Sequence, residues 1–203
     1  MSTPAPMTLW YEFASSYSYL AVMRVQAAAD TAGVELHWRP FLLGPVFLSL
    51  GWNDSPFNIY PPKGRYMWRD MERLCERYGF PFTMPSEFPR NGLLAARVAR
   101  LGQEEDWIGP FSRTVMQANF GEDRDIGDPD VLGGILDDLG LDADTLILQA
   151  QSDDNRKALR AQVEEATQMG LFGAPTFVVG KELFWGNDRL EDALDWAQHH
   201  PAV

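Results

Sequence analysis

Residues 171–190 read LFGAPTFVVGKELFWGNDRL, and this stretch decides the fold. Pro175 comes directly before the apolar run 176–179, which is typical of a short buried strand. A Gly-Lys pair follows, which is the pattern of a two-residue type II′ hairpin turn with glycine first. Residues 182–185 form the returning strand, and a Gly-Asn-Asp sequence then precedes a last helix. The stretch therefore predicts a β-hairpin followed by a helix.

The proline that opens this hairpin affects the residue before it. Proline lacks a backbone N–H and adopts the cis form at low cost, so we expect the Ala174–Pro175 bond to be cis. The N–H and C=O of Ala174 are then free to pair with an extended peptide, in the manner of an added strand. A capped hairpin with an ordinary loop proline is the alternative interpretation.

The amino-terminal region predicts a strand, a helix and a second strand. Residues 8–13 (TLWYEF) are of β type, and apolar residues at helical spacing continue from there to Gly33. Either Ser15 or Ser16 can cap the helix, because a serine oxygen accepts an unpaired N–H of the first turn. Residues 34–40 alternate between apolar and polar. Such a βαβ unit places its two strands parallel.

The middle of the chain is rich in helical patterns. Residues 41–62 are rich in glycine, proline and aromatic residues, and they predict an irregular segment of the kind that often carries function. Residues 65–78 predict a helix whose apolar face includes Cys75, so we interpret this thiol as a core residue rather than a nucleophile. After a proline-rich connector over 80–89, further helices are predicted at 91–101, 106–118, 129–139, 143–151 and 155–169.

Strands at the two ends of the chain thus enclose a helical block. The order βαβ, helices, ββα is the plan of an α/β thioredoxin-like fold with a large all-helical insertion. We predict a discontinuous thioredoxin-like domain, residues 1–45 and 170–203, and a helical insertion domain, residues 46–169. In that plan the start of the first helix meets the proline before the third strand, so Ser15 and Pro175 are expected to be neighbours.

Three motifs carry a resemblance to a known family. They are FASSYSYL over 13–20, GAPT over 173–176 and WGNDRL over 185–190. Together they resemble the 2-hydroxychromene-2-carboxylate isomerase family, which is related to kappa-class glutathione transferases and to the DsbA-like thioredoxin superfamily. The resemblance extends over about residues 8–198. It implies a DsbA-like fold, a homodimer, a glutathione cofactor and an aromatic unsaturated keto acid as substrate, in the breakdown of aromatic compounds.

The resemblance also implies a reaction. Opening of 2-hydroxychromene-2-carboxylate gives a benzylidenepyruvate, and a glutathione thiolate adds to its conjugated double bond. The resulting single bond rotates, and elimination returns the trans alkene with glutathione regenerated. A kappa-type transferase, which would keep the adduct, is a close alternative. An alternative of another class is a non-catalytic thioredoxin-like module that holds a peptide or glutathione.

Site residues follow from the resemblance by position. Ser15 matches the catalytic serine that contacts the glutathione sulfur, although many relatives have proline where this chain has Ser16, which leaves the choice between the two serines open. Ala174 and Pro175 match the segment whose backbone pairs with the cysteinyl part of glutathione. The γ-glutamyl end is implied to lie at Asn187 and Asp188.

The residue types agree with this chemistry. Residues 15–18, Ser-Ser-Tyr-Ser, stand where a redox thioredoxin would carry its C-x-x-C motif, and serine forms no disulfide. A serine hydroxyl at a helix N-terminus can nevertheless donate to a thiolate and lower the thiol pKa of a bound glutathione. Plain helix capping is the alternative for Ser15. Asp188 and Glu191 also fit a capping box, and Asn187 also fits a turn.

The aromatic-rich segment supplies the remaining candidates. Lys63 and Arg65 are candidates for carboxylate recognition, Lys63 toward the cofactor and Arg65 toward the substrate; a solvated helix start is the alternative. Trp52 and Asn53, with Tyr17 beside the serines, are candidate substrate-binding residues. Aromatic residues here are equally compatible with an ordinary core.

Composition excludes several classes of function. Hydrophobic residues make up 45% of the 203-residue chain, which suits a globular core, and its net charge of −12 argues against nucleic acid as a partner. No apolar run has the length of a membrane span, and the first residues lack a secretory signal, so we expect a cytoplasmic protein. One cysteine and three histidines at scattered positions predict neither a disulfide nor a metal site.

Overall fold

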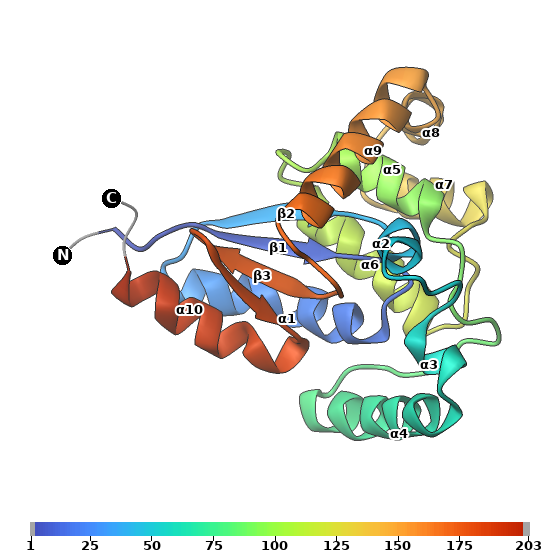
Figure 1. The fold of residues 1–203 in the computed structure, drawn as a ribbon. Helices are drawn as coiled ribbons and strands as arrows, with labels where there is room; N and C mark the ends of the chain where they lie inside the picture. The colour runs from blue at the N-terminus through green and yellow to red at the C-terminus, as the bar shows by residue number, and fades with distance from the viewer. Residues whose placement is uncertain (1–2, 201–203) are drawn as a thin grey trace.

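Figure 1 shows the computed structural model of the chain, which describes residues 3–200. A central mixed sheet carries helices on both faces; α1 and α10 lie on one face, α9 crosses the other, α5, α7 and α8 lie to the right of the sheet, and α4 lies below it. The elements are β1 (Met7–Tyr11), α1 (Ser16–Ala32), β2 (Leu36–Pro40), α2 (Leu43–Ser49), α3 (Pro56–Ile59), α4 (Pro61–Tyr78), α5 (Leu93–Leu101), α6 (Ile108–Phe120), α7 (Pro129–Asp138), α8 (Ala143–Ala150), α9 (Asp153–Gln168), β3 (Thr176–Val179), β4 (Glu182–Trp185), a 3₁₀ turn (Asn187–Arg189) and α10 (Leu190–His199).

The sheet has the strand order β2-β1-β3-β4, which confirms the predicted thioredoxin-like plan. β1 pairs parallel with β2, whereas the β1–β3 and β3–β4 pairs are antiparallel. The hairpin turn between β3 and β4 has a positive φ of 61° at Gly180, as the first position of a type II′ turn requires. All four residues of β3 are buried, so this strand is covered on both faces.

Alternation along the strands distributes their side chains between two buried layers. Leu9 and Phe177 pack with α1 and α10 in the larger core cluster. Trp10 and Val178, one residue further along each strand, pack with residues of α2 and α9 on the other face. Successive side chains point to opposite faces, and both faces are buried. The strands in the middle of the sheet therefore have almost no polar positions.

The predicted irregular segment 41–62 is wrong in part, because it contains two short helices and the start of a third. Ser55 caps α3 by accepting the N–H of Phe57, and Pro56 occupies the first helical position. Pro61 begins α4 four residues before the predicted start. Proline suits the first turn of a helix because its missing N–H has no partner there, so these prolines begin helices rather than break them.

The predicted capping box at the last helix is also wrong. Asp188 lies inside a 3₁₀ turn that precedes α10, and its side chain makes no cap hydrogen bond. Glu191 does not reach back to the helix start, because it forms an ion pair with Arg24 of α1. The contact between α1 and α10 therefore determines the direction of this side chain.

Cys75 is 1% exposed and lies on the buried face of α4, which confirms its interpretation as a core residue. The core cluster around it contains residues of the sheet and α1 together with residues of α4 to α7. The predicted division into two domains stays a prediction.

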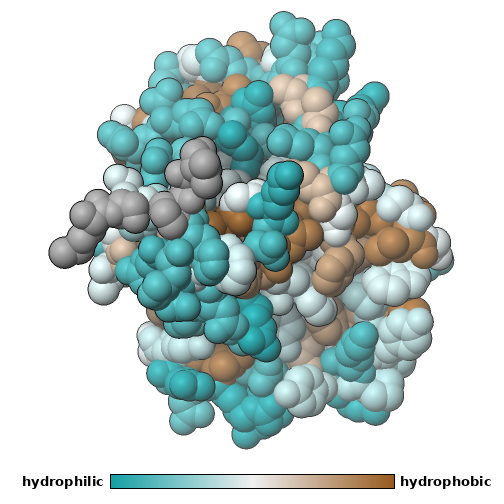
Figure 2. Space-filling view, turned by 60° about the vertical axis from the view of Figure 1, so that its left-hand side comes forward, coloured by the Kyte–Doolittle hydropathy of each residue, from teal (hydrophilic) through white to brown (hydrophobic). Residues whose placement is uncertain are grey.

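In residues 3–200, no helix is both long and apolar enough to cross a membrane. Figure 2 shows hydrophilic residues over much of one face, with hydrophobic residues mainly in its middle.

Candidate functional site

A cleft of about 890 Å³ opens where the N-terminus of α1 meets the segment before β3. α2, α3 and α4 form its opposite wall, and the turn after β4 closes one end. The cleft is thus bounded by segments from both ends of the chain and from its middle. The lining residues that the sequence predicted are Ser15, Tyr17, Trp52, Asn53, Lys63, Ala174, Asn187 and Asp188.

Ser15 is the cap of α1 and faces the cleft. Its Oγ accepts the N–H of Ser18 at 3.2 Å, which satisfies a backbone group of the first turn. The same hydroxyl donates to the carbonyl of Ala174 at 3.0 Å. Two residues that are 159 positions apart in the sequence are therefore in direct contact at the positive end of a helix.

Ser16 lies in different surroundings from Ser15. Its side chain is 1% exposed, and its hydroxyl donates to the sulfur of Met67 at 3.0 Å. The hydroxyl is therefore committed to the packing between α1 and α4. Both serines line the cleft, but Ser15 rather than Ser16 caps α1 and contacts Ala174.

The Ala174–Pro175 bond is cis, as expected from the sequence. Pro175 itself is buried and does not line the cleft, and its carbonyl accepts the N–H of Gly186 at 3.0 Å. Ala174 does line it, and within residues 3–200 its N–H has no hydrogen-bond partner. An unpaired N–H next to an accessible carbonyl is the arrangement that a peptide backbone can pair with. Gly173 allows Trp185 to cover this edge, because a Cβ there would lie 2.3 Å from the indole nitrogen.

Asn187 and Asp188 lie at one end of the cleft. Asn187 is 3% exposed, and its amide oxygen accepts from Arg24 at 3.0 Å. Asp188 is exposed and lies 3.4 Å from the guanidinium of Arg189. A buried amide beside a carboxylate gives this end hydrogen-bonding groups and negative charge, which suits an ammonium group.

Aromatic side chains line the cleft both on α1 beside Ser15 and on the wall opposite it. Trp52 packs on Phe47, with ring centroids 5.7 Å apart, and Tyr17 packs on Phe57 at 6.1 Å. The Tyr17 hydroxyl donates to Asp70 at 3.0 Å, and burial with this carboxylate nearby raises the pKa of Tyr17 far above its usual range. Tyr17 is therefore a neutral hydrogen-bonded wall residue.

Lys63 lines the cleft, but Arg65, predicted as a substrate-binding residue, does not. The two positions lie on different faces of α4, because successive helical residues are separated by about 100°. Arg77, three turns further along α4, lines the cleft in its place. It stands at the spacing of the face that carries Tyr66 and Asp70. The predicted helix 65–78 already contains this face, but which face meets the cleft depends on how α4 packs against the rest of the protein.

Glu12 lines the cleft, although no sequence pattern pointed to this residue. Its carboxylate accepts the N–H of Leu43 at 3.0 Å, and its backbone carbonyl accepts the N–H of Ser15. Burial raises the pKa of Glu12 from 4.5 to about 7, although the hydrogen bond from Leu43 acts in the opposite direction. A carboxyl group three residues before Ser15 therefore titrates near neutral pH.

Arg90 is a second residue that sequence reasoning missed. It lines the cleft and is 6% exposed. Its guanidinium donates to the carbonyl of Arg124 at 2.9 Å, to the Asn119 side chain at 3.1 Å and to Asp123. The Asn119 amide in turn donates to the carbonyl of Phe13 at 2.9 Å. This network fixes the chain just before Ser15.

Among the described residues, no cluster of three or more His, Cys, Asp or Glu side chains could hold a metal ion.

Comparison with known proteins identifies the family to which the chain belongs. The family model described as "DSBA-like thioredoxin domain" matches residues 7–196. The 2-hydroxychromene-2-carboxylate isomerase of Sphingobium xenophagum is 32% identical over 183 residues, which is 90% of this chain and 92% of the relative. The chain belongs to the 2-hydroxychromene-2-carboxylate isomerase family of DsbA-like thioredoxin domains.

Solved structures place the isomerase family and this chain in the same fold. A structure of 2-hydroxychromene-2-carboxylate isomerase superposes with a TM-score of 0.84 at 25% identity, covering 93% of this chain and 94% of that one. Human glutathione S-transferase kappa 1 is 23% identical, over 93% of this chain and 88% of its own length. This chain is therefore similar in sequence to a kappa-class glutathione transferase as well.

Proposed function

We propose that the protein is a glutathione-dependent isomerase that converts 2-hydroxychromene-2-carboxylate, or a similar aromatic unsaturated keto acid, between cis and trans forms. The observation that carries the proposal is the Ser15 hydroxyl, which lies at the N-terminus of α1 and 3.0 Å from the Ala174 carbonyl. Family membership supports the same reading. A cytoplasmic location and a homodimer stay predictions.

The residues around Ser15 fit glutathione. The unpaired N–H and the carbonyl of Ala174 can pair with the backbone of its cysteinyl residue, which brings the sulfur toward Ser15. Asn187 and Asp188 offer an amide and a carboxylate for the γ-glutamyl end, and Lys63 offers a cation for a carboxylate. When bound, glutathione supplies a thiolate that adds to a conjugated double bond. Rotation about the resulting single bond precedes the elimination that releases the thiolate.

Ser15 then has two roles. Its oxygen keeps the N–H of Ser18, while its proton turns from the Ala174 carbonyl to the sulfur. The carbonyl that it leaves becomes available to the cysteinyl N–H, so the exchange of partners leaves no buried polar group unpaired. A charge-assisted hydrogen bond and the positive helix end together lower the thiol pKa.

The aromatic side chains of the cleft can bind the substrate. Trp52, Tyr17 and Phe57 provide flat apolar surface for an aromatic ring. Asn53 and Arg77 lie on the rim and can contact its keto acid. Because the neutral Tyr17 hydroxyl is held by Asp70, this side of the cleft keeps a fixed shape.

The test is to incubate the protein with 2-hydroxychromene-2-carboxylate, with and without reduced glutathione, and to analyse products by absorbance and chromatography. We expect isomerisation that requires catalytic glutathione, with glutathione recovered unchanged. A stoichiometric glutathione conjugate would identify a kappa-type transferase instead. Glutathione binding without turnover would identify a binding module.

A further inference from the structure

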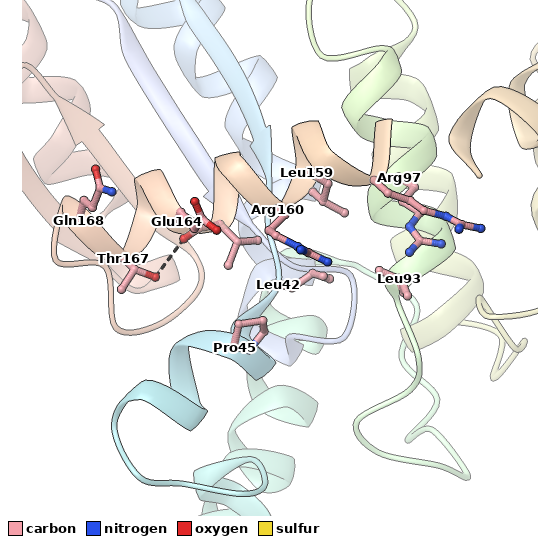
Figure 3. Close-up of a pocket in the computed structure, with 11 residues that line it drawn as sticks. Leu42, Pro45, Leu93, Arg97, Leu159, Arg160, Glu164, Thr167 and Gln168 are labelled. Atoms are coloured by element: carbon pink, nitrogen blue, oxygen red, sulfur yellow. Dashed lines mark hydrogen bonds between the residues drawn. The ribbon is translucent and has the colours of Figure 1, made fainter. Parts of the chain in front are cut away.

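A second cavity lies between α5 and α9, behind the first turn of α2. It has a volume of about 600 Å³, within the range of small-molecule sites, and shares no lining residue with the cleft at Ser15. Figure 3 shows Arg160 leaving α9 toward the side on which Leu93 and Arg97 of α5 lie. We call this cavity the arginine groove.

Three guanidinium groups gather in the arginine groove. Arg97 comes from α5, and Arg156 and Arg160 lie one turn apart on α9. Within residues 3–200, no carboxylate lies within ion-pair distance of Arg97 or Arg160, and Arg156 has only Asp153 at 3.6 Å. Such a cluster is unusual in a chain with a net charge of −12, where acidic partners are abundant.

Among the described residues, Arg97 lacks a compensating partner, because Glu164, the carboxylate that lines the groove, forms no ion pair with it. Its Nε atom is buried and has no hydrogen-bond partner within residues 3–200. Burial and the neighbouring Arg156 lower the pKa of Arg97. A buried donor without an acceptor is costly, so an anion bound here would relieve both the unpaired N–H and the repulsion between like charges.

Apolar side chains lie among the arginines of the groove (Figure 3). Leu42, Leu93 and Leu159 line it, beside the arginine side chains. Guanidinium groups recognise carboxylates and phosphates through paired hydrogen bonds, whereas leucine surface favours hydrocarbon. The ligand that satisfies both kinds of side chain is an amphipathic anion.

We propose that the arginine groove binds a small molecule with one carboxylate or phosphate head and an apolar body. The head lies between Arg97 and Arg160, and the body lies against Leu42, Leu93 and Leu159. The proposal does not depend on the glutathione chemistry, because the two cavities are lined by different residues.

Calorimetric titration with octanoate and octyl phosphate tests the proposal, with 1-octanol and inorganic phosphate as probes of each half alone. We expect the two amphipathic anions to bind at one site and each half to bind at least about tenfold more weakly. A preference between octanoate and octyl phosphate identifies the head group, and either preference supports the proposal.

Variants locate the site. Arg160→Gln, at an exposed position that tolerates substitution, and Arg97→Gln should each weaken octanoate binding roughly 10- to 100-fold. Lys157→Gln on α9 and Arg100→Gln on α5 remove the same charge outside the groove, and they should bind octanoate as the parent does. Circular dichroism and the unfolding midpoint show that each variant is folded.

Three results would overturn the proposal. The first is equal octanoate affinity in the parent and in Arg160→Gln. The second is 1-octanol binding as tightly as octanoate. The third is octanoate that is displaced by reduced glutathione, which would place it in the cleft at Ser15.

Discussion

At the scale of single residues, Ser15 and Ser16 are neighbours whose hydroxyls have different partners. Ser15→Ala removes the hydroxyl that faces the cleft, so turnover with glutathione should fall about 10- to 100-fold. It also removes the helix cap, which costs about 1 kcal/mol of stability. Ser15→Asn keeps a capping oxygen without the hydroxyl and should lose turnover while keeping stability.

Ser16→Ala is the matched control for this prediction, because its hydroxyl bonds Met67 inside the core. Steady-state rates should change little in this variant. Lost turnover in Ser16→Ala together with normal turnover in Ser15→Ala would contradict the assignment of Ser15.

Glu12 gives a prediction for the pH dependence of stability. Its pKa in the folded protein, about 7, lies above the ordinary value of 4.5, so the folded protein holds this proton more tightly than the unfolded chain. Its contribution is therefore fully present below pH 4.5 and is lost as pH rises through about 7. At about 1.4 kcal/mol for each pKa unit, the full loss between pH 4.5 and about pH 7 amounts to roughly 3–4 kcal/mol.

Glu12→Gln tests this directly, because the amide keeps an acceptor for the Leu43 N–H but carries no titratable proton. Urea unfolding at about pH 5 and about pH 8 should show roughly 2–3 kcal/mol less loss in the variant than in the parent. Glu105→Gln, at an exposed position, should follow the parent. Parallel pH profiles for Glu12→Gln and the parent would show that Glu12 titrates normally.

At the scale of elements, Arg90 joins the connector before α5 to the turn after α6. Arg90→Ala leaves the carbonyls of Asn119 and Arg124 without this donor, in addition to the Asp123 side chain. Since each unsatisfied buried acceptor costs about 1–3 kcal/mol, the free energy of unfolding should fall by at least about 3 kcal/mol. Chemical denaturation measures the change.

Arg124→Ala is the control for this element. Arg124 lies half-exposed, 3.5 Å from Glu122, and such surface pairs contribute about 0–1 kcal/mol. The prediction fails if the two variants lose similar stability. If Arg90→Ala does not fold, Arg90→Lys, which keeps the charge but loses the planar fork, should show an intermediate loss.

At the scale of the whole molecule, the core connects the sheet to the inserted helices. Because one buried cluster contains residues of β1, α1 and α4 to α7, we expect a single unfolding transition. Far-ultraviolet circular dichroism and tryptophan fluorescence should therefore give the same midpoint in urea. Two separate midpoints would indicate that the predicted helical insertion, residues 46–169, unfolds by itself.

The amino-acid sequence by itself determined the sheet, the position of α1 and the hairpin. These features are encoded in local patterns, namely the β-type runs over 8–13 and 176–179, the alternation over 34–40, a serine at the start of α1 and a Gly-Lys turn. The cis bond at Pro175 and the burial of Cys75 were predictable for the same reason. Prolines in 41–62 misled the prediction, because proline both interrupts helices and begins them.

Only the tertiary structure decided which groups meet in the cleft. Ser15 rather than Ser16 faces Ala174, because Met67 of a distant helix takes the Ser16 hydroxyl. Arg24 likewise forms an ion pair with Glu191, which the sequence suggested for a capping box, and the packing of α4 turns Arg77 rather than Arg65 toward the cleft. A side chain turns toward the partner that best satisfies its charge or hydrogen bond, and those partners lie far away in the sequence.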